Sequence, residues 1–425
     1  MIKELRVEHW KSFDQAALYI DPLTIVIGTN ASGKSNLLEA LVFLQRIGSG
    51  ATVDQAINGN NLLPALRGGS ESLCRRPAHE FSLEVVIGAT EQEDYIYRIQ
   101  VRTDGAHVDL IDETLTALVY GASDGEVRKK RLIWTEPAPV GAASASPEGF
   151  PVKHYVVAAI DSGMPWKLPI KKGLVTGSIL PFELIFADAQ EAAVLNVVLD
   201  DLKQIFVFDP IPSRMRDYAK LSDRLQEDGS NIAGVLAALD KERRTAVEQS
   251  LTNHLKSLPE RDITRVWTEL IGVFENDAML YCEEGWSGAV GQTIDTRTMS
   301  DGTLRYLAIV TAMLVRPAGS LLVIEDVDNG LHPSRAGLLI EMLRTLGKER
   351  GIDVIVTTHN PALLDAAGVR MLPFITVAHR DGATGASRLT QLEDIAQLPK
   401  LMAGGSLGQL ATAGRIEAAL EADGT

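Results

Sequence analysis

The stretch Gly28-Thr29-Asn30-Ala31-Ser32-Gly33-Lys34-Ser35 decides the fold, because it fills every fixed position of the phosphate-binding motif G-x-x-x-x-G-K-[ST]. The apolar run 23–27 before it predicts a buried strand, and residues 36–44 after it have apolar side chains at helical spacing. A glycine-rich turn that matches by chance would not need this context, whereas a phosphate-binding loop does. The chain is therefore predicted to bind a nucleotide.

The chemistry of such a loop gives its residues distinct roles. The glycines let backbone N–H groups surround an anion at the positive N-terminal end of the following helix. Lys34 would reach the β- and γ-phosphates, and the Ser35 hydroxyl would bind Mg²⁺. The residues predicted to contact the nucleotide are Gly28, Thr29, Asn30, Ala31, Ser32, Gly33, Lys34, Ser35 and Asn36.

Composition limits the classes of protein that the chain can belong to. With 425 residues and 45% apolar content it can bury a large core, and its net charge of −15 argues against whole-surface attraction to nucleic acid or anionic lipid. No window approaches the roughly 18 apolar residues of a membrane helix, and the first residues lack the apolar centre of a signal peptide. Two distant cysteines, Cys74 and Cys282, have no metal-ligand spacing. We expect a cytoplasmic protein without a zinc site.

The first part of the chain is predicted to be rich in strands. Residues 2–9 and 16–20 alternate apolar and polar positions, and a Gly- and Asn-rich loop is expected over 48–69. Short alternating segments then predict an antiparallel β-subdomain, at 81–87, 95–102, 107–111, 117–120 and 131–135. Residues 140–149 have the small and Pro/Gly-rich composition of a surface linker.

Two sets of basic residues in this part have open roles. Arg67 could turn toward the nucleotide or be a solvated loop arginine. The run Arg128-Lys129-Lys130-Arg131 is the densest basic stretch, and it is either a contact for DNA or an acidic partner or a solvated hairpin end.

The middle of the chain changes character. Residues 183–205 and 231–257 have apolar side chains at helical spacing, which predicts a helical insertion, and 262–274 and 278–283 return to β character as though they rejoin a central sheet. The predicted division is an N-terminal lobe over 1–160, a helical insertion over 161–260 and a C-terminal lobe over 261–425.

The second half of the predicted site comes from the far end of the chain. A Ser/Asp/Gly turn at Ser300 opens an amphipathic helix, and the buried run 321–324 leads directly into Glu325 and Asp326. Such an acidic pair is costly unless it serves a cation or a proton transfer. Another buried strand, 354–358, ends in His359, which is either a turn or capping histidine or a γ-phosphate contact. In open α/β sheets, ligands bind at this edge.

Together these segments resemble the ABC/SMC-like ATPases, and among them the single-chain ATPases related to the overcoming-lysogenization-defect and recombination-repair families. Ser300-Asp301-Gly302-Thr303 looks like the signature loop, Leu321 to Pro333 like the Walker B strand and its following loop, and Thr358-His359-Asn360-Pro361 like the switch histidine. Asp228 to Ala233 resembles a helix-start motif of these ATPases. The resemblance implies an α/β ATPase head with a central mixed sheet flanked by helices, an antiparallel β-subdomain and a helical insertion.

The resemblance also implies the cofactors and the roles of residues. ATP and Mg²⁺ would bind, with Ser35 and Glu325 as the metal residues, and Lys34, Asp326 and His359 would be catalytic. Asp326 would orient or deprotonate the attacking water, while Ser300 and Gly302 would contact the nucleotide of a second subunit. A homodimer closed on two ATP molecules follows from this arrangement.

Three positions depart from the family pattern or stay open. Asp326 stands where Glu is common, and Val327 where Pro is common, so the carboxylate is set back by about 1.5 Å and slow hydrolysis is expected. Gln55 and Gln100 are both candidates for the glutamine that links Mg²⁺ to the insertion.

Three function classes are compatible with these residues. The first is a sensor or scaffold in DNA maintenance or anti-phage defence with a separate effector, a nuclease or a toxin-like protein, because the residues after His359 contain no Glu plus Asp-x-Asp set for two metals. The second is a transporter ATPase, which the roughly 265 residues between Lys34 and Ser300 disfavour. The third is a small-molecule P-loop kinase, which would not need Ser300 or His359.

Overall fold

The computed structural model describes residues 1–105, 107–121, 127–137, 153–158, 165–168, 189–259, 263–285 and 291–423. The predicted linker over 140–149, the parts of the predicted insertion at 161–164, 169–188 and 260, and residue 262 of a predicted β segment lie outside these ranges. The chain divides into two compact units, each built from separate segments. The first contains Met1–Ile20, Thr29–Ile205 and Ala378–Leu389, and the second contains Asp21–Gly28, Phe206–Val377 and Thr390–Thr425.

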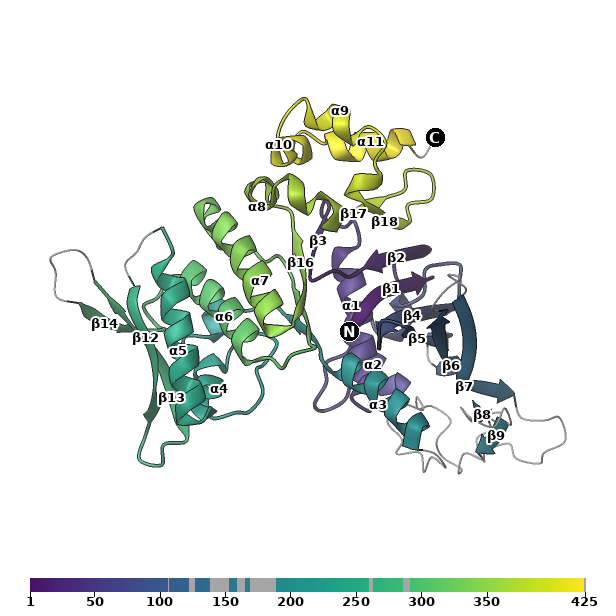
Figure 1. Ribbon diagram of the computed structural model, residues 1–425, viewed down its shortest axis with the longest axis horizontal. Helices are drawn as coiled ribbons and strands as arrows, with labels where there is room; N and C mark the ends of the chain where they lie inside the picture. The colour runs from purple at the N-terminus through teal and green to yellow at the C-terminus, as the bar shows by residue number, and fades with distance from the viewer. Residues whose placement is uncertain are drawn as a thin grey trace. The chain divides into compact units, whose positions relative to one another are not determined.

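The first unit is built on an eight-stranded antiparallel sheet with the order β2-β1-β4-β5-β6-β7-β8-β9 (Figure 1). The strands are β1 (Ile2–Glu8), β2 (Gln15–Tyr19), β4 (Glu80–Gly88), β5 (Glu93–Thr103), β6 (Val108–Tyr120), β7 (Val127–Pro137), β8 (Lys153–Ala158) and β9 (Pro165–Leu168). The helices of this unit are α1 (Lys34–Gly48), α2 (Val53–Asn58) and α3 (Ala189–Lys203).

The core of the first unit includes an aromatic cluster behind α1. Trp10 is fully buried, and its ring centroid lies 4.9 Å from that of Phe81 in an edge-on arrangement. Phe43 of α1 packs edge-on against Phe81 at 5.8 Å. Because edge-to-face pairs match the positive ring edge to the negative face of the partner, these contacts add to the burial that holds α1 on its sheet.

The second unit contains most of the sheet that includes the strand before the phosphate loop. A six-stranded sheet has the order β10-β15-β16-β3-β17-β18, in which β15, β16, β3 and β17 pair in parallel. Their bounds are β10 (Ile205–Phe208), β15 (Leu321–Ile324), β16 (Asp353–Thr358), β3 (Leu23–Ile27), β17 (Ile375–Arg380) and β18 (Ser387–Gln391). Every residue of β3 and β15 is buried, as expected for parallel strands that are covered on both faces.

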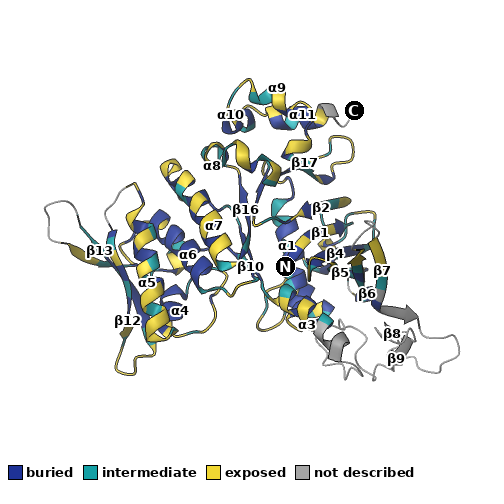
Figure 2. Cartoon of the chain, viewed as in Figure 1, coloured by how far each residue is buried: buried dark blue, intermediate teal, exposed yellow. Residues whose placement is uncertain are grey.

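The helices of the second unit pack into one apolar core with this sheet. They are α4 (Ile232–Ala238), α5 (Lys241–Lys256), α6 (Asp301–Val315), α7 (Ala336–Arg350), α8 (Pro361–Ala367), α9 (Leu398–Met402), α10 (Leu407–Thr412) and α11 (Arg415–Asp423). α7 lies beside β16 (Figure 1). α6 is buried from Gly302 to Leu314, as the dark ribbon in Figure 2 shows. Burial raises the pKa of Tyr306 in this helix to about 12.

A third sheet also belongs to the second unit. It contains β11 (Ala219–Lys220), β12 (Ile263–Ile271), β13 (Asp277–Glu284) and β14 (Gln292–Asp295), and β12 packs against α5. The expectation that 262–274 and 278–283 rejoin the central sheet is therefore wrong. The two segments pair with each other along their length, from Ile271↔Asp277 to Ile263↔Glu284, and form a separate antiparallel sheet.

Three further local predictions needed correction. The expected loop over 48–69 contains α2, which begins with a reciprocal capping box between Thr52 and Gln55. The segments 107–111 and 117–120 are parts of one strand, β6. The predicted helix over 231–257 is two helices, since the chain leaves the helical conformation at Leu239 and Asp240 caps α5.

No helix in the described part of the chain is long and apolar enough to cross a membrane.

Candidate functional site

The phosphate loop begins at the end of β3 and continues into α1. Gly28, Ala31 and Gly33 have φ values of 151°, 63° and 114°. A residue with a Cβ would be strained at a φ of 114°, so the backbone requires glycine at position 33. Lys34 folds back over the loop, and its Nζ donates to the carbonyl of Thr29 at 3.1 Å.

Side chains far away in sequence support the loop from behind. A Cβ on Gly33 would lie 2.5 Å from Ser387 Oγ and 3.0 Å from Phe13 Cζ. Ser387 Oγ in turn lies 2.7 Å from Ser12 Oγ, which also accepts a hydrogen bond from Asn36 Nδ2 at 2.8 Å. Asn36 is predicted to contact the nucleotide, but its side-chain amide binds Ser12 and so helps to support the loop.

The loop has the features of an anion site. Ser32 is 1% exposed, and its Oγ has no hydrogen-bond partner, which is costly for a buried hydroxyl unless a ligand supplies one. The Lys34 ammonium lies within the same loop. Among the described residues, no group of three or more His, Cys, Asp or Glu side chains could hold a metal ion. A Mg²⁺ bound mainly by nucleotide phosphates, one hydroxyl and one carboxylate fits this composition, because Mg²⁺ prefers oxygen ligands and few protein side chains.

The carboxyl ends of three parallel strands meet at one edge of the six-stranded sheet. Ile324 of β15 pairs with Val356 of β16, and Thr358 of β16 pairs with Ile27 of β3. Gly28 follows β3, and Glu325 follows β15. The first residue of the phosphate loop and the predicted acidic pair are therefore brought to the same edge, as expected for a ligand site in an α/β sheet.

Asp326 has an unusual backbone conformation for a non-glycine residue. Its φ is 43°, and its N–H donates to Thr357 Oγ1 at 2.8 Å. Such conformations persist only where surrounding contacts hold them, and they are concentrated at functional sites. The carboxylate stays 40% exposed, which leaves it accessible to water or a ligand.

His359 lies next to this carboxylate. Its Nδ1 is 3.7 Å from Asp326 Oδ1, and its side chain is 61% exposed. The capping alternative is wrong, because Asn360 caps α8 through a 2.9 Å hydrogen bond from the N–H of Ala362 to its Oδ1. Beneath the histidine, the buried Thr358 hydroxyl donates to Asp328 and accepts from the N–H of Asn360. These hydrogen bonds hold the end of the strand from which the His359 side chain projects.

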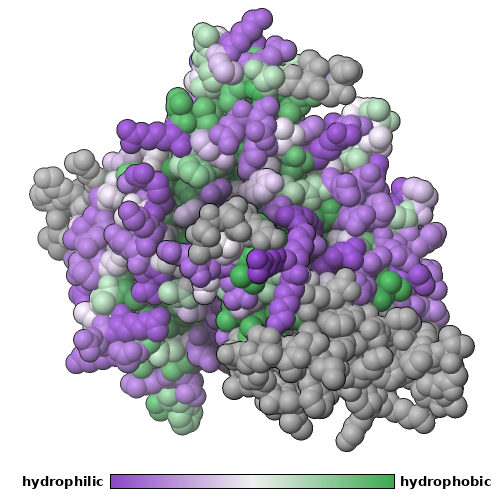
Figure 3. All heavy atoms as spheres, turned by 45° about the vertical axis from the view of Figure 1, so that its right-hand side comes forward, coloured by the Kyte–Doolittle hydropathy of each residue, from purple (hydrophilic) through white to green (hydrophobic). Residues whose placement is uncertain are grey.

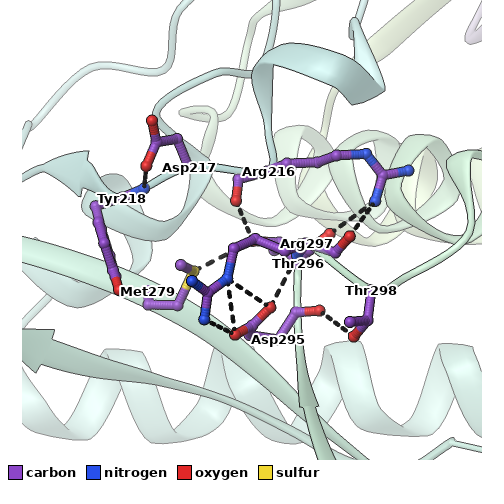
Figure 4. Close-up of polar contacts among 8 residues, drawn as sticks. All are labelled: Arg216, Asp217, Tyr218, Met279, Asp295, Thr296, Arg297 and Thr298. Carbon is purple, nitrogen blue, oxygen red and sulfur yellow. Dashed lines mark hydrogen bonds and ion pairs between the residues drawn. The ribbon is translucent and has the colours of Figure 1, made fainter.

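The predicted signature turn forms a well-supported helix start. Ser300 is the N-cap of α6, and its Oγ accepts from the N–H of Thr303 at 3.1 Å. Arg216 holds the segment before it, because its Nη1 donates to the carbonyls of Thr296, Arg297 and Met299 and its Nη2 pairs with Asp301. Figure 4 shows the Arg216 side chain extended along this segment.

The same segment has a local ion pair. Arg297 pairs with Asp295, and the N–H of Arg297 also donates to that carboxylate at 3.0 Å. These hydrogen bonds hold the pKa of Asp295 below its usual range.

Arg67 is anchored at the helix that follows the phosphate loop. Its Nε donates to Glu39 Oε1 at 2.9 Å, and Lys11 pairs with the other oxygen of the same carboxylate. Burial alone would raise the pKa of Glu39, but the hydrogen bonds from Arg67 and Lys11 outweigh it and hold that pKa below its usual range. Arg67 is therefore a solvent-exposed arginine, with 63% of its side chain accessible, whose guanidinium pairs with Glu39.

The other open candidates have structural partners or an exposed position. Gln55 Oε1 accepts from the N–H of Thr52 in the capping box, and Gln100 Nε2 donates to Glu80 at 2.9 Å. The basic run lies in the first half of β7, where Arg128 and Lys129 are exposed and Lys130 is half-buried. Arg131 pairs with Thr116 in the ladder between β6 and β7.

Comparisons with known proteins agree with this geometry. Residues 1–120 match the family described as "AAA ATPase domain", and residues 212–365 match the family described as "AAA domain, putative AbiEii toxin, Type IV TA system". A solved SMC head, bound to the C-terminal winged-helix domain of ScpA, matches with a TM-score of 0.52 and 11% identity over 92% of this chain and 97% of that chain. Two families of ATPase domain thus match separate parts of the chain, and its fold is that of an SMC head.

Two other SMC heads match the chain with lower TM-scores. One, with an extended coiled coil and bound to the C-terminal domain of ScpA from Pyrococcus furiosus, has 11% identity and a TM-score of 0.48 over 95% of this chain and 99% of that chain. The SMC head from Thermotoga maritima has 14% identity and a TM-score of 0.41 over 92% and 98%. The search of curated protein sequences found no match to the chain.

Sequence reasoning missed several residues that shape the candidate site. Ser12 and Ser387 lie 375 positions apart, so no local signal links them. Arg380, whose Nε donates to the carbonyl of Ala31 at 2.8 Å, is equally distant. Arg305 looks like an ordinary helical arginine in the sequence, yet it is 4% exposed. A buried arginine is rare enough that burial alone would have singled it out.

Proposed function

We propose that this chain is an ABC/SMC-like ATPase that binds ATP with Mg²⁺ at the phosphate loop and hydrolyses it slowly. The observation that supports this most strongly is the single sheet edge at which Gly28, the pair Glu325 and Asp326, and His359 follow three neighbouring parallel strands. This combination includes a phosphate-binding loop, carboxylates and an imidazole, the groups that ATP hydrolysis uses.

In the proposed reaction each residue has a defined task. Lys34 and the backbone N–H groups of residues 28–33 hold the phosphates, and Ser35 and Glu325 provide oxygen ligands for Mg²⁺, which when bound neutralises phosphate charge. Asp326 accepts a proton from the attacking water, and the imidazole of His359 donates to a γ-phosphate oxygen. The two side chains lie 3.7 Å apart, so a protonated His359 would form an ion pair with Asp326.

We further propose that two copies close on two ATP molecules. Ser300 and Gly302 would contact the nucleotide held by the partner, since the N-terminus of a 15-residue helix attracts phosphate. ATP would then favour the closed dimer and hydrolysis would reopen it.

The cellular role proposed is that of a sensor or scaffold in DNA maintenance or anti-phage defence. The family match to an AbiEii-type domain supports the defence role, with a separate nuclease or toxin-like effector. Arg128, Lys129, Lys130 and Arg131 would provide a local DNA contact on β7, where Arg128 and Lys129 are exposed. The face of the molecule drawn in Figure 3 is mostly hydrophilic over its described residues.

Two variants test the ATPase proposal. Lys34→Ala should abolish ATP binding in calorimetry, whereas Asp326→Asn should retain binding, lose hydrolysis and accumulate a dimer in size-exclusion chromatography with light scattering. Lys348→Ala and Asp223→Asn, which change exposed residues of the same types, are the matched controls. Hydrolysis by Asp326→Asn at the wild-type rate would show that another group is the base.

Two further measurements test the cellular role. Arg128→Glu with Lys129→Glu should weaken DNA binding and reduce its salt dependence by about two charges. Cleavage of DNA by the purified chain with Mg²⁺ or Mn²⁺ would rule out the need for a separate nuclease.

A further inference from the structure

Arg305 connects the start of α6 with the end of β15. It lies five residues after Ser300, and its side chain is 5% exposed. Its Nη2 donates to the carbonyls of Glu325 at 2.7 Å and Asp326 at 3.0 Å and pairs with Asp209 Oδ1 at 3.2 Å. Its Nη1 donates to the carbonyl of Pro210 at 2.8 Å. One buried guanidinium thus holds the backbone of both acidic residues.

A second, independent contact joins the same two segments. A Cβ on Gly302 would lie 2.6 Å from the carbonyl oxygen of Gly330 and 3.4 Å from Arg335 Nη1. The first turn of α6 therefore packs backbone against backbone on the loop that follows β15, and only glycine permits this approach.

Asp326 is held from both sides. Its N–H is bound by the Thr357 hydroxyl from β16 and its carbonyl by Arg305 from α6. Because φ is 43°, contacts of this kind are what keep the residue in this conformation. The direction of the Asp326 carboxylate therefore depends on where α6 lies.

We propose that Arg305 is a positioning residue that couples the signature turn to the water-activating carboxylate. This proposal rests on the proposed function, in which Ser300 contacts the nucleotide of a second copy and Asp326 receives a proton. Movement of Ser300 toward the partner's nucleotide is transmitted through one helical turn and the Arg305 guanidinium to the carbonyl of Asp326. Hydrolysis in each head thereby depends on engagement of the other.

The test compares Arg305→Met and Arg305→Lys in steady-state ATP hydrolysis. Arg305→Met should lower kcat by roughly 10- to 100-fold with KM and ATP affinity within about twofold, since small misplacements of a reacting group cost this much. Arg305→Lys should recover part of the loss, because an ammonium keeps the charge but not the planar set of donors. Arg46→Met is the matched control, because Arg46 is 6% exposed and its Nη1 donates to the carbonyl of Ala56. The Arg46→Met variant should have a lower free energy of unfolding than the wild type and an unchanged kcat.

Hydrogen exchange provides a readout that needs no hydrolysis. The N–H groups of Asp326, Val327, Asn329 and Leu331 are all hydrogen-bonded within the segment 325–331 or to Thr357. Arg305→Met should speed their exchange by about tenfold or more and leave that of β12 and β13 unchanged. Unchanged exchange in 325–331, or a kcat equal to the wild type, would overturn the coupling. Wild-type protein that binds ATP without hydrolysing it would instead refute the proposed function, and the exchange measurement would still decide the role of Arg305.

Discussion

The phosphate loop and the strand-end residues Glu325, Asp326 and His359 form the two halves of the proposed site in different ways. The loop is eight consecutive residues whose conformation comes from its own glycines, with positive φ at Gly28 and Gly33. The strand-end residues come from two segments, and they are positioned by hydroxyl and guanidinium groups from other elements.

This difference shows which kind of site a short motif can specify. A backbone cradle is determined by where glycine is present, so it can be recognised in the sequence. A side-chain arrangement at a sheet edge depends on strand order, and its supports, Thr357, Thr358 and Arg305, have no motif of their own. The two halves should therefore respond differently to substitution.

The largest effect is expected from a substitution that adds a side chain at a glycine of the phosphate loop. Gly33→Ala would place a Cβ 2.5 Å from Ser387 Oγ at a φ of 114°, and Ser387 cannot retreat because it is fully buried and bonded to Ser12. Strain and overpacking together should cost about 2–6 kcal/mol of the free energy of unfolding and weaken ATP binding at least tenfold. Urea denaturation and calorimetry measure the two quantities.

Gly382→Ala is the control for this change. No heavy atom lies within 4 Å of the Cβ that it would add. The free energy of unfolding should change by less than about 0.5 kcal/mol. If Gly33→Ala were as mild as the control, the loop would owe its conformation to its distant supports rather than to its glycine.

The contrast also explains how much of the molecule could be predicted from the sequence. The buried strands at 23–27, 321–324 and 354–358 were predicted because an apolar run marks a strand wherever it pairs. Their common edge follows once they are strands of one parallel sheet. The position of β12 and β13 could not be predicted, because alternation shows a strand but not its partner.

Other parts were missed for local reasons. The capping box of Thr52 and Gln55 was a readable signal for α2, but its glycine- and asparagine-rich surroundings favoured a loop. The burial of Arg305 had no signal, since a helical arginine normally faces solvent and only the carbonyls at the end of β15 explain its burial.

The second prediction concerns the support of the strand ends. Thr358→Val removes a hydroxyl that donates to Asp328 and accepts from Asn360, and both Thr358 and Asp328 are buried. Loss of these bonds should destabilise the fold by about 1–3 kcal/mol, measured by thermal and urea denaturation.

Thr311→Val is its control. Thr311 is equally buried, but its hydroxyl donates only to the carbonyl of Leu307 one helical turn earlier. That variant should change the free energy of unfolding by less than about 0.5 kcal/mol. Equal losses of the free energy of unfolding in Thr358→Val and Thr311→Val would mean that the hydrogen bonds of Thr358 with Asp328 and Asn360 add no stability.

The third prediction separates function from stability in the same strand. Thr357→Val removes the acceptor for the N–H of Asp326 and should lower the ATP hydrolysis rate by about tenfold while ATP affinity stays within about twofold. Thr357→Ser keeps the hydroxyl and should hydrolyse ATP near the wild-type rate. A slow Thr357→Ser enzyme would assign the effect to the methyl group and its packing instead.

The smallest effect is expected at the segment before the signature turn. The folded-state pKa of Asp295 is lowered by its hydrogen bonds from Arg297, so ionised Asp295 stabilises the fold above its ordinary pKa of about 3.9. That contribution disappears as the pH falls through the lower folded-state pKa. Since Arg297 is 60% exposed, Asp295→Asn should lower the free energy of unfolding by less than about 1 kcal/mol at pH 7.

Urea denaturation from pH 7 to pH 3.5 should show that the difference in the free energy of unfolding between variant and wild type shrinks only below about pH 4. A difference that is constant with pH would mean that the charge of Asp295 adds nothing to stability, and that the segment before the signature turn is held by its other hydrogen bonds, those of Arg216 among them.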